Sequence, residues 1–318
     1  MRLEGAATPL TPRESGGRPQ AAKLFEIRDF IELTKPRITW LILMSTGIGY
    51  FFGLSAAGNW AHFLQSLRFW PILHTLVGTG LIASGTAALN QWYERDADRM
   101  MRRTSSRPLP TGRISSNGAL AFGVLLSLAG FVELWQGVNL LCASIGIFTL
   151  ASYLFLYTPL KQRTWWSTTI GAIPGAMPPV IGYAAAAGAV TREAWALAAI
   201  LFLWQFPHFY SIAWMYKDDY ARAGIRMLPV VEPDCRSTAR QIVFFGLALI
   251  PVSLIPGILG MSGRIYSVGA LLLGAWFLYS GVRVALERTS VRARGVLLTS
   301  VMYLPLIYTL MLLDRPGL

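Results

Sequence analysis

The sequence is poor in charged residues and in cysteine. Only 14% of its 318 residues are Asp, Glu, Lys or Arg, whereas a soluble domain carries about a quarter. This shortage excludes an ordinary soluble globular fold. The two cysteines, Cys142 and Cys235, fall in an apolar run and in a loop, too far apart in the expected topology to pair. The sequence therefore predicts neither a disulfide framework nor a cysteine-type zinc site.

Hydrophobic residues, by contrast, make up 54% of the chain and occur in long runs. A helix rises about 1.5 Å per residue, so about 20 apolar residues cross a bilayer core. Residues 1–34 are expected to form a disordered or interfacial arm, and 35–318 the transmembrane domain. No cleaved signal peptide is expected, because the first apolar run begins at Ile38 and has full span length. The runs predict an all-α polytopic membrane protein with nine transmembrane helices, at 38–56, 70–93, 117–136, 139–158, 167–188, 194–216, 240–260, 266–284 and 296–313.

The basic residues are distributed unevenly between the loops. Of the 28 Lys and Arg residues, 24 lie in the N-terminal arm or in the loops after the second, fourth, sixth and eighth runs. The positive-inside rule assigns that side to the cytoplasm. We therefore expect a multi-pass protein of the inner membrane with a cytoplasmic N-terminus and an external C-terminus. The net charge of +12 follows from this topology and from attraction to the lipid bilayer, so no nucleic-acid partner is expected.

Acidic residues gather in two loops on the predicted cytoplasmic face. After the second run, Asn90, Glu94 and Asp98 recur at intervals of four, so a helix continuing through them places three oxygen-bearing side chains on one stripe. Such a stripe suits a hard divalent cation held by oxygen ligands and substrate phosphates. The alternative is a helix end whose acids pair with nearby arginines, as we expect for Asp96. Asn90 favours the cation site, because a polar group at membrane depth is usually functional.

The second acidic group follows the sixth run, where Asp218 and Asp219 lie between Lys217 and Arg222. Two acidic groups at equivalent helix ends, each with cations beside it, are typical of Mg²⁺ bridging carboxylates to a diphosphate. A solvated charged loop is the alternative, and it is favoured for Arg222 and Glu232 individually. The mouth of an apolar bundle suits an allylic diphosphate whose tail lies in the membrane, because a cavity without water protects the carbocation formed on ionisation.

Three further features concern the fourth, fifth and sixth runs. Lys161 follows the fourth run on the predicted cytoplasmic face. The Gly- and Pro-rich stretch 171–182 indicates close helix packing or a bend beside a cavity. His208 lies inside the sixth run, about three helical turns from Asp219. It is either functional, as ionisable residues in spans usually are, or bonded to a carbonyl freed by Pro207.

Together these segments resemble the UbiA superfamily of intramembrane prenyltransferases, and most closely its haem-modifying branch. The resemblance covers the chain from about Lys35. An Arg-Thr-x-x-Arg-Pro motif is shared widely in the superfamily, whereas a Pro-His-Phe element and an Asp-Tyr-x-x-Ala-Gly-x-x-Met-Leu-Pro run point to the haem branch. The residues that carry the resemblance are Lys35-Pro36-Arg37, Asn90-x-Trp92-x-Glu94-x-x-x-Asp98, Arg103-Thr104-x-x-Arg107-Pro108, Tyr157-Thr158-x-x-Lys161, Pro207-His208-Phe209 and Asp219-Tyr220-x-x-Ala223-Gly224-x-x-Met227-Leu228-Pro229.

The resemblance implies a UbiA-type helical bundle and a defined reaction. A farnesyl group would pass from farnesyl diphosphate to a vinyl group of haem B, giving haem O, with haem B as substrate rather than cofactor. A haem A synthase that receives the product is an expected partner. The metal ligands implied for Mg²⁺, held through the diphosphate, are Asn90, Glu94, Asp98 and Asp219. These four and Lys161 would be catalytic, and the implied substrate-binding residues are Arg103, Arg107, Lys217, Tyr157, His208 and Tyr220.

One departure from the superfamily pattern leaves the second cation site open. Members with a complete second motif repeat acids four residues apart, whereas Met215 and Ala223 flank Asp219 here. Three other functions stay open: prenylation of another aromatic acceptor, such as a 4-hydroxybenzoate-like compound or a chlorin, a polytopic transporter, and a non-catalytic haem-handling scaffold. A transporter would need a polar path through both faces, but nearly all acids lie at one mouth.

Overall fold

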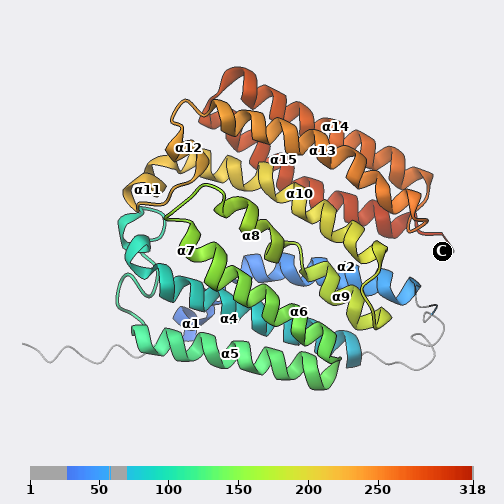
Figure 1. The fold of residues 1–318 in the computed structure, drawn as a ribbon, viewed down its shortest axis with the longest axis horizontal. Helices are drawn as coiled ribbons and strands as arrows, with labels where there is room; N and C mark the ends of the chain where they lie inside the picture. Colours follow the sequence, from blue (N-terminus) through green and yellow to red (C-terminus); the bar gives the residue numbers. More distant parts are fainter. Residues whose placement is uncertain (1–26, 57, 59–69, 317–318) are drawn as a thin grey trace, which may run out of the picture.

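The computed structural model describes residues 27–56, 58 and 70–316, and all regular secondary structure in this part of the chain is helical (Figure 1). Nine segments of the described chain are long and apolar enough to cross a membrane. This confirms the all-α polytopic fold with nine spans. Residues 1–26 of the expected N-terminal arm lie outside the described residues, and the remainder of the arm contains helix α1 (Ile27–Leu33).

Most of the spans are single helices, and two are interrupted. The fifth span consists of α8 (Ser167–Gly175) and α9 (Pro178–Ala187). Pro178 and Pro179 begin α9, where their missing N–H groups cost no helical hydrogen bond. The single-helix spans are α2 (Pro36–Ala56), α4 (Trp70–Met100), α5 (Ser116–Gly137), α10 (Arg192–Met215), α13 (Arg236–Ile258), α14 (Arg264–Glu287) and α15 (Ser290–Leu313).

Helix α4 is longer than the apolar run that predicts it. Its 31 residues extend about 46 Å, well beyond the roughly 30 Å of a hydrocarbon core. The helix therefore continues through Asn90, Glu94 and Asp98, as their spacing predicts. The last turns of α4 carry these side chains beyond the purely apolar stretch and into contact with the loops at one end of the bundle.

Helices α2 and α9 pack closely at two glycines. A Cβ atom at Gly182 would collide with the backbone carbonyl of Thr46, and one at Gly49 would collide with the backbone of Pro179. Small residues let helix backbones approach each other within a membrane, where dispersion contacts replace the hydrophobic effect. The expectation of close helix packing in the fifth span is therefore confirmed.

The close contact between α2 and α9 is expected to limit the size of the side chain at Gly182. Gly182→Ala is expected to lower the melting temperature of the detergent-solubilised protein, because overpacking a tight contact costs about 1–3 kcal/mol. Gly47→Ala is the matched control, since no atom lies within 4 Å of a Cβ at that position of α2. Thermal unfolding followed by intrinsic fluorescence measures both variants. Equal melting temperatures for the two variants would contradict the close contact.

The functional loops gather at one end of the bundle. The loop after α4 lies at the same end as α11 (Lys217–Arg222) and α12 (Leu228–Val231) in Figure 1. Helix α1 is attached near this end by an ion pair between Asp29 Oδ1 and Arg113 Nε, 2.9 Å apart. Segments that are far apart in the sequence thus meet where the long helix α4 ends.

Candidate active site

The three predicted oxygen ligands lie along one stripe of α4 and are largely withdrawn from solvent. Asn90 is 2% exposed and Asp98 is 1% exposed, and the side chain of Glu94 is 12% exposed. Buried polar groups require partners, because an unpaired carboxylate away from water is costly. Each of the three side chains has a partner from another part of the chain.

The two carboxylates are neutralised by cations from different loops. Glu94 Oε1 lies 2.8 Å from Lys161 Nζ, and the Lys161 side chain is also only 12% exposed. Asp98 Oδ2 lies 2.8 Å from a guanidinium nitrogen of Arg107. Thr104 donates its hydroxyl proton to the backbone carbonyl of Asp98 at 2.9 Å, which attaches the following loop to the end of α4. The Arg-Thr-x-x-Arg sequence thus folds back on the helix that precedes it.

Asn90 is held from two sides. Its Oδ1 accepts a hydrogen bond from Lys35 Nζ at 3.3 Å, and its Nδ2 donates to Thr158 Oγ1 at 3.3 Å. The Thr158 hydroxyl in turn donates to the Tyr153 carbonyl at 2.8 Å. The amide of Asn90 is therefore fixed in orientation, with its oxygen directed toward a cation.

Lys35 also belongs to this cluster, a role that its position in the sequence does not predict. Its φ of 48° lies in the left-handed region, which costs a non-glycine residue roughly 1–2 kcal/mol. The pKa of Lys35 is lowered to about 7, chiefly by burial and also by the nearby cations Arg107 and Lys161, against the opposing effect of Glu94 and Asp98. A strained backbone and a destabilised positive charge at one residue indicate a position maintained for the site.

Lys161 differs electrostatically from Lys35. Burial alone would lower its pKa, but the Glu94 carboxylate in direct contact raises the pKa of Lys161 well above its usual value. The ammonium also lies 4.4 Å from the ring centroid of Tyr157, within the range of a cation–π interaction. The contacts with Glu94 and Tyr157 therefore favour the charged form of Lys161.

A π-helical turn places Tyr157 and Lys161 at the end of the fourth span. This span consists of α6 (Leu140–Ala151), the π-helix η1 (Ser152–Tyr157) and α7 (Thr158–Leu160). The N–H of Thr158 donates to the carbonyl of Tyr153, five residues earlier. Pro159 follows and supplies no N–H group, so the regular pattern cannot resume at once. Short π-helical insertions are frequent at functional sites.

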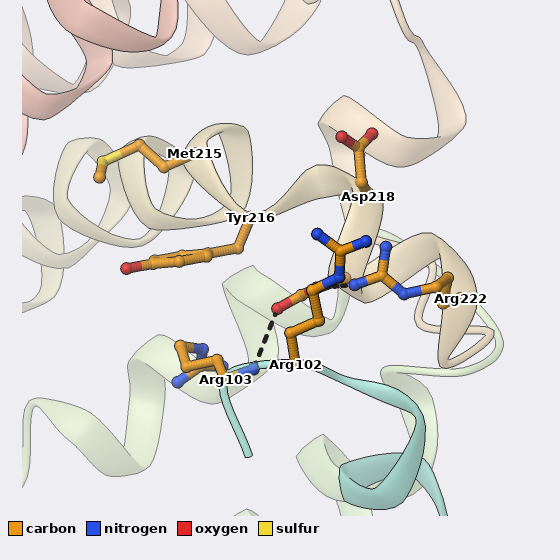
Figure 2. Close-up of a pocket in the computed structure, with 7 residues that line it drawn as sticks. Arg102, Arg103, Met215, Tyr216, Asp218 and Arg222 are labelled. Carbon is orange, nitrogen blue, oxygen red and sulfur yellow. Dashed lines mark hydrogen bonds and ion pairs between the residues drawn. The ribbon is translucent and has the colours of Figure 1, made fainter. Parts of the chain in front are cut away.

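The second acidic segment lines a pocket of about 570 Å³ with the loop after α4 (Figure 2). Asp219 is buried, and its Oδ2 accepts a hydrogen bond from the backbone N–H of Arg103 at 3.3 Å. Its other oxygen is paired with the Arg222 guanidinium. The pocket is therefore rich in cations and has one fully neutralised carboxylate. Its lining residues are Arg102, Arg103, Met215, Tyr216, Asp218, Asp219 and Arg222.

Two tyrosines hold the side chain of Arg103. The guanidinium carbon lies 5.3 Å from the Tyr216 ring centroid and 5.9 Å from that of Tyr220. Figure 2 shows the Tyr216 ring lying alongside Arg103. Arg103 also donates to the Tyr220 hydroxyl at 3.4 Å. The cation is thus positioned by aromatic faces and retains donors for a further ligand.

Most of the predicted site residues converge, and two lie apart. Lys217 is directed to the carbonyl of Pro233, 3.5 Å from its Nζ. His208 lies within α10, and its Nδ1 is 2.8 Å from the hydroxyl of Ser300 on α15. The alternative in which His208 bonds a carbonyl freed by Pro207 is therefore wrong, because its partner is a side chain of another helix. The residues that gather at the end of the bundle are Asn90, Glu94, Asp98, Arg103, Arg107, Tyr157, Lys161, Asp219 and Tyr220.

Several residues of the site are not predicted from the sequence. Arg222 is expected to be a solvated charge, yet it pairs with Asp219 and lines the pocket. Arg102 and Tyr216 line the same pocket, and Thr158 supports Asn90. For Arg102, Tyr216 and Arg222 the available signal is proximity in sequence to an acidic residue, whereas Thr158 lies in the Tyr157-Thr158-x-x-Lys161 segment that carries the family resemblance. Asp96 behaves as expected, since Arg99 lies 3.2 Å from its carboxylate on an exposed face.

The donor set suits a magnesium ion that enters together with a diphosphate. Within the described residues, no three His, Cys, Asp or Glu side chains are grouped closely enough to form a metal centre by themselves. Mg²⁺ usually takes one or two carboxylates and completes its octahedral shell with substrate phosphates and water. The oxygen atoms of Asn90, Glu94, Asp98 and Asp219 fit that requirement in chemical type. The cations now paired with the carboxylates can serve the phosphate oxygens.

A nine-span helical bundle with oxygen ligands and cations at one end is the architecture of an intramembrane prenyltransferase. Residues 41–310 match the UbiA prenyltransferase family, and the chain belongs to that family. It is an integral membrane enzyme. The chain is 79% identical over 292 residues to the protoheme IX farnesyltransferase of Solibacter usitatus, covering 92% of this chain and 100% of that protein. The protoheme IX farnesyltransferase of Koribacter versatilis is 47% identical, with coverage of 94% and 96%.

Solved structures share the fold at low sequence identity. A digeranylgeranylglyceryl phosphate synthase matches with a TM-score of 0.72 and 17% identity, covering 93% of this chain and 100% of that chain. A UbiA homologue from Archaeoglobus fulgidus bound to GPP and Mg²⁺ matches with a TM-score of 0.61 and 14% identity, covering 89% and 99%. These similarities confirm the expected UbiA-type bundle.

Proposed function

We propose that this chain transfers the farnesyl group of farnesyl diphosphate to a vinyl group of haem B, forming haem O and diphosphate. The relatives named protoheme IX farnesyltransferase support the choice of substrates. The structural observation that carries the proposal is the meeting of Asn90, Glu94 and Asp98 on α4 with Lys161, Arg107 and the Asp219 pocket at one end of the bundle.

The proposed metal ligands are Asn90, Glu94, Asp98 and Asp219. Their oxygens come from two segments that the contact between Arg103 and Asp219 joins. A structure of the same fold bound to GPP and Mg²⁺ supports the use of magnesium, and the choice of these four ligands is our proposal. Held by these residues, Mg²⁺ would supply the positive charge that neutralises the leaving diphosphate. The ligand positions are prepared by hydrogen bonds, since Asn90 is fixed by Lys35 and Thr158.

The proposed diphosphate-binding cations are Lys161, Arg103, Arg107 and Lys217. An arginine has five N–H donors, so Arg107 can keep its contact with Asp98 and donate to a phosphate oxygen as well. Lys161 lies between Glu94 and Tyr157 and supplies a fixed positive charge. Lys217 is half-buried and its present partner is the Pro233 carbonyl 3.5 Å away, so a rotation of its side chain would be needed to bring its ammonium to the diphosphate.

The chemistry requires an apolar cavity beside this charged group. Ionisation breaks the bond between farnesyl C1 and the diphosphate oxygen, and a vinyl carbon of haem B then forms the new bond to C1. Water adds to the resulting cation and loses a proton, which leaves a hydroxyl group on the product. The ring faces of Tyr157 and Tyr220 are proposed to stabilise the allylic cation. Exclusion of water until the carbon–carbon bond forms prevents premature hydrolysis.

The proposed setting is the inner membrane, with the site at the cytoplasmic face. The bias of Lys and Arg toward one set of loops supports a cytoplasmic N-terminus and an external C-terminus. The product keeps its porphyrin and gains a long apolar tail, so it stays in the bilayer. A haem A synthase in the same membrane is the proposed recipient.

The substrates are tested by comparing acceptors directly. The purified full-length protein is incubated with farnesyl diphosphate, Mg²⁺ and either haem B, 4-hydroxybenzoate or a chlorin, and the products are analysed by mass spectrometry. We expect haem O only, and none when EDTA removes the metal. A prenylated benzoate or chlorin with unchanged haem B would assign the enzyme to another acceptor. Haem retained without any product would instead identify a haem-handling scaffold.

A further inference from the structure

The imidazole of His208 is held in one orientation by two neighbours. Its ring stacks on that of Trp204, with centroids 4.7 Å apart and an interplanar angle of 22°. Its Nδ1 lies 2.8 Å from Ser300 Oγ on α15. Trp204 also donates its indole N–H to the backbone carbonyl of Ser300 at 2.8 Å. Helices α10 and α15 therefore fix both the plane and the edge of the ring.

The hydrogen bonds around Ser300 determine which nitrogen of His208 carries the proton. The Ser300 hydroxyl donates its single proton to the carbonyl of Leu297 at 2.6 Å. Ser300 Oγ must then accept from His208 Nδ1–H, and the neutral ring carries its lone pair on Nε2. Among the described residues, Nε2 of His208 makes no hydrogen bond. It is also not fully enclosed by neighbouring atoms, so part of its surface is accessible. A lone pair is therefore presented outward from a fixed ring.

The position of His208 relates it to the proposed site. His208 and Met215 are seven residues apart on α10, so they lie on the same stripe, about 10 Å apart along the helix axis. Met215 lines the pocket that contains Asp219. His208 is thus at a greater depth in the bundle than the charged groups, on the face of the helix that leads to them.

We propose that Nε2 of His208 is an axial ligand of the iron of the haem substrate, and that Ser300 positions it. This inference rests on the proposed function. Neutral imidazole is a common ligand of haem iron, and a metal-binding histidine usually donates its other N–H to a fixed acceptor. Iron ligation would hold the porphyrin against α10 so that one edge faces the allylic group.

The competing explanation is that His208 and Ser300 only join two membrane helices, as hydrogen bonds across spans commonly do. Iron ligation has a spectroscopic consequence that helix packing lacks. The full-length protein in nanodiscs is titrated with haem B, and the iron–histidine stretching band of the ferrous complex is recorded by resonance Raman spectroscopy. His74→Ala is the matched control, because His74 is engaged by Glu133 at 2.6 Å on another helix pair.

We expect the iron–histidine band in the wild type and in His74→Ala, and its loss in His208→Ala. Added imidazole should restore the band in His208→Ala. Ser300→Ala should shift the band to lower frequency and weaken haem binding about 10- to 100-fold, whereas Ser300→Thr, which keeps the hydroxyl, should resemble the wild type. The band persisting in His208→Ala, or its absence in a haem-bound wild type, would overturn the proposal. Haem O formation is measured on the same samples. A wild type that forms haem O without the band would contradict iron ligation alone, whereas a wild type that forms no haem O would contradict the proposed function.

Discussion

Replacing Asp98 with asparagine is expected to lower the rate of haem O formation by about 10²- to 10³-fold while the protein still folds and inserts. Asparagine preserves the shape of this fully buried residue and its hydrogen bond to Arg107. It removes the negative charge that a magnesium–diphosphate complex requires. The measurement is turnover by purified protein at saturating substrates, with the melting temperature recorded in parallel.

Asp96→Asn is the control for this variant. Asp96 lies on the same helix two residues earlier, but its side chain is 70% exposed and is paired with Arg99. Exposed ion pairs contribute little to stability, so this variant should retain the activity and stability of the wild type. Near-normal turnover of Asp98→Asn would remove the metal-binding role proposed for α4.

Replacing Lys161 with methionine should affect both stability and substrate affinity. Breaking a largely buried ion pair costs about 3–5 kcal/mol, because the remaining Glu94 carboxylate is left without a partner. The double variant with Glu94→Gln removes that unpaired charge, so most of the stability should return. Activity should not return in the double variant, because both groups are proposed to act on the magnesium–diphosphate complex.

The two effects are separated by measuring thermal unfolding and kinetics on the same preparations. In the single variant we expect the KM for farnesyl diphosphate to rise by about tenfold or more, which is the loss of one charge-assisted contact. The double variant should combine a near wild-type melting temperature with low turnover. Recovery of turnover together with stability would show that Lys161 serves only to neutralise Glu94.

Features governed by local sequence are predicted correctly. The nine spans of the described chain follow from apolar run length alone, since crossing a bilayer core takes about 20 apolar residues. The helical stripe of Asn90, Glu94 and Asp98 follows from a spacing of four. The resemblance to the UbiA superfamily names nine residues that meet at one end of the bundle, together with Lys217 and His208, which lie apart from them. These predictions need only helical periodicity and short motifs.

Features that depend on tertiary contacts are not predicted. Lys35 reaches Asn90 across 55 positions of sequence from a left-handed backbone conformation. Ser300 determines the tautomer of His208 across 92 positions. Arg222 is indistinguishable from a solvated charge until its neighbours are known. Residue type and spacing do not encode which helix faces which, so the partners of these groups require the folded chain.

The π-turn in the fourth span has a consequence for how this segment tolerates change in length. Each residue of an α-helix advances the chain by about 100° around the axis. The π-helix η1 contains one residue more than an α-helical turn would, and this residue rotates the chain that follows about the helix axis. The rotation allows Phe155 and Leu156, which are 69% and 54% exposed, to face the lipid while Lys161 contacts Glu94. Inserting or deleting one residue here would leave a span long enough to cross the membrane, but the ammonium of Lys161 would point away from Glu94. The length of this segment is dictated by its chemistry, and the thickness of the membrane is only a secondary constraint.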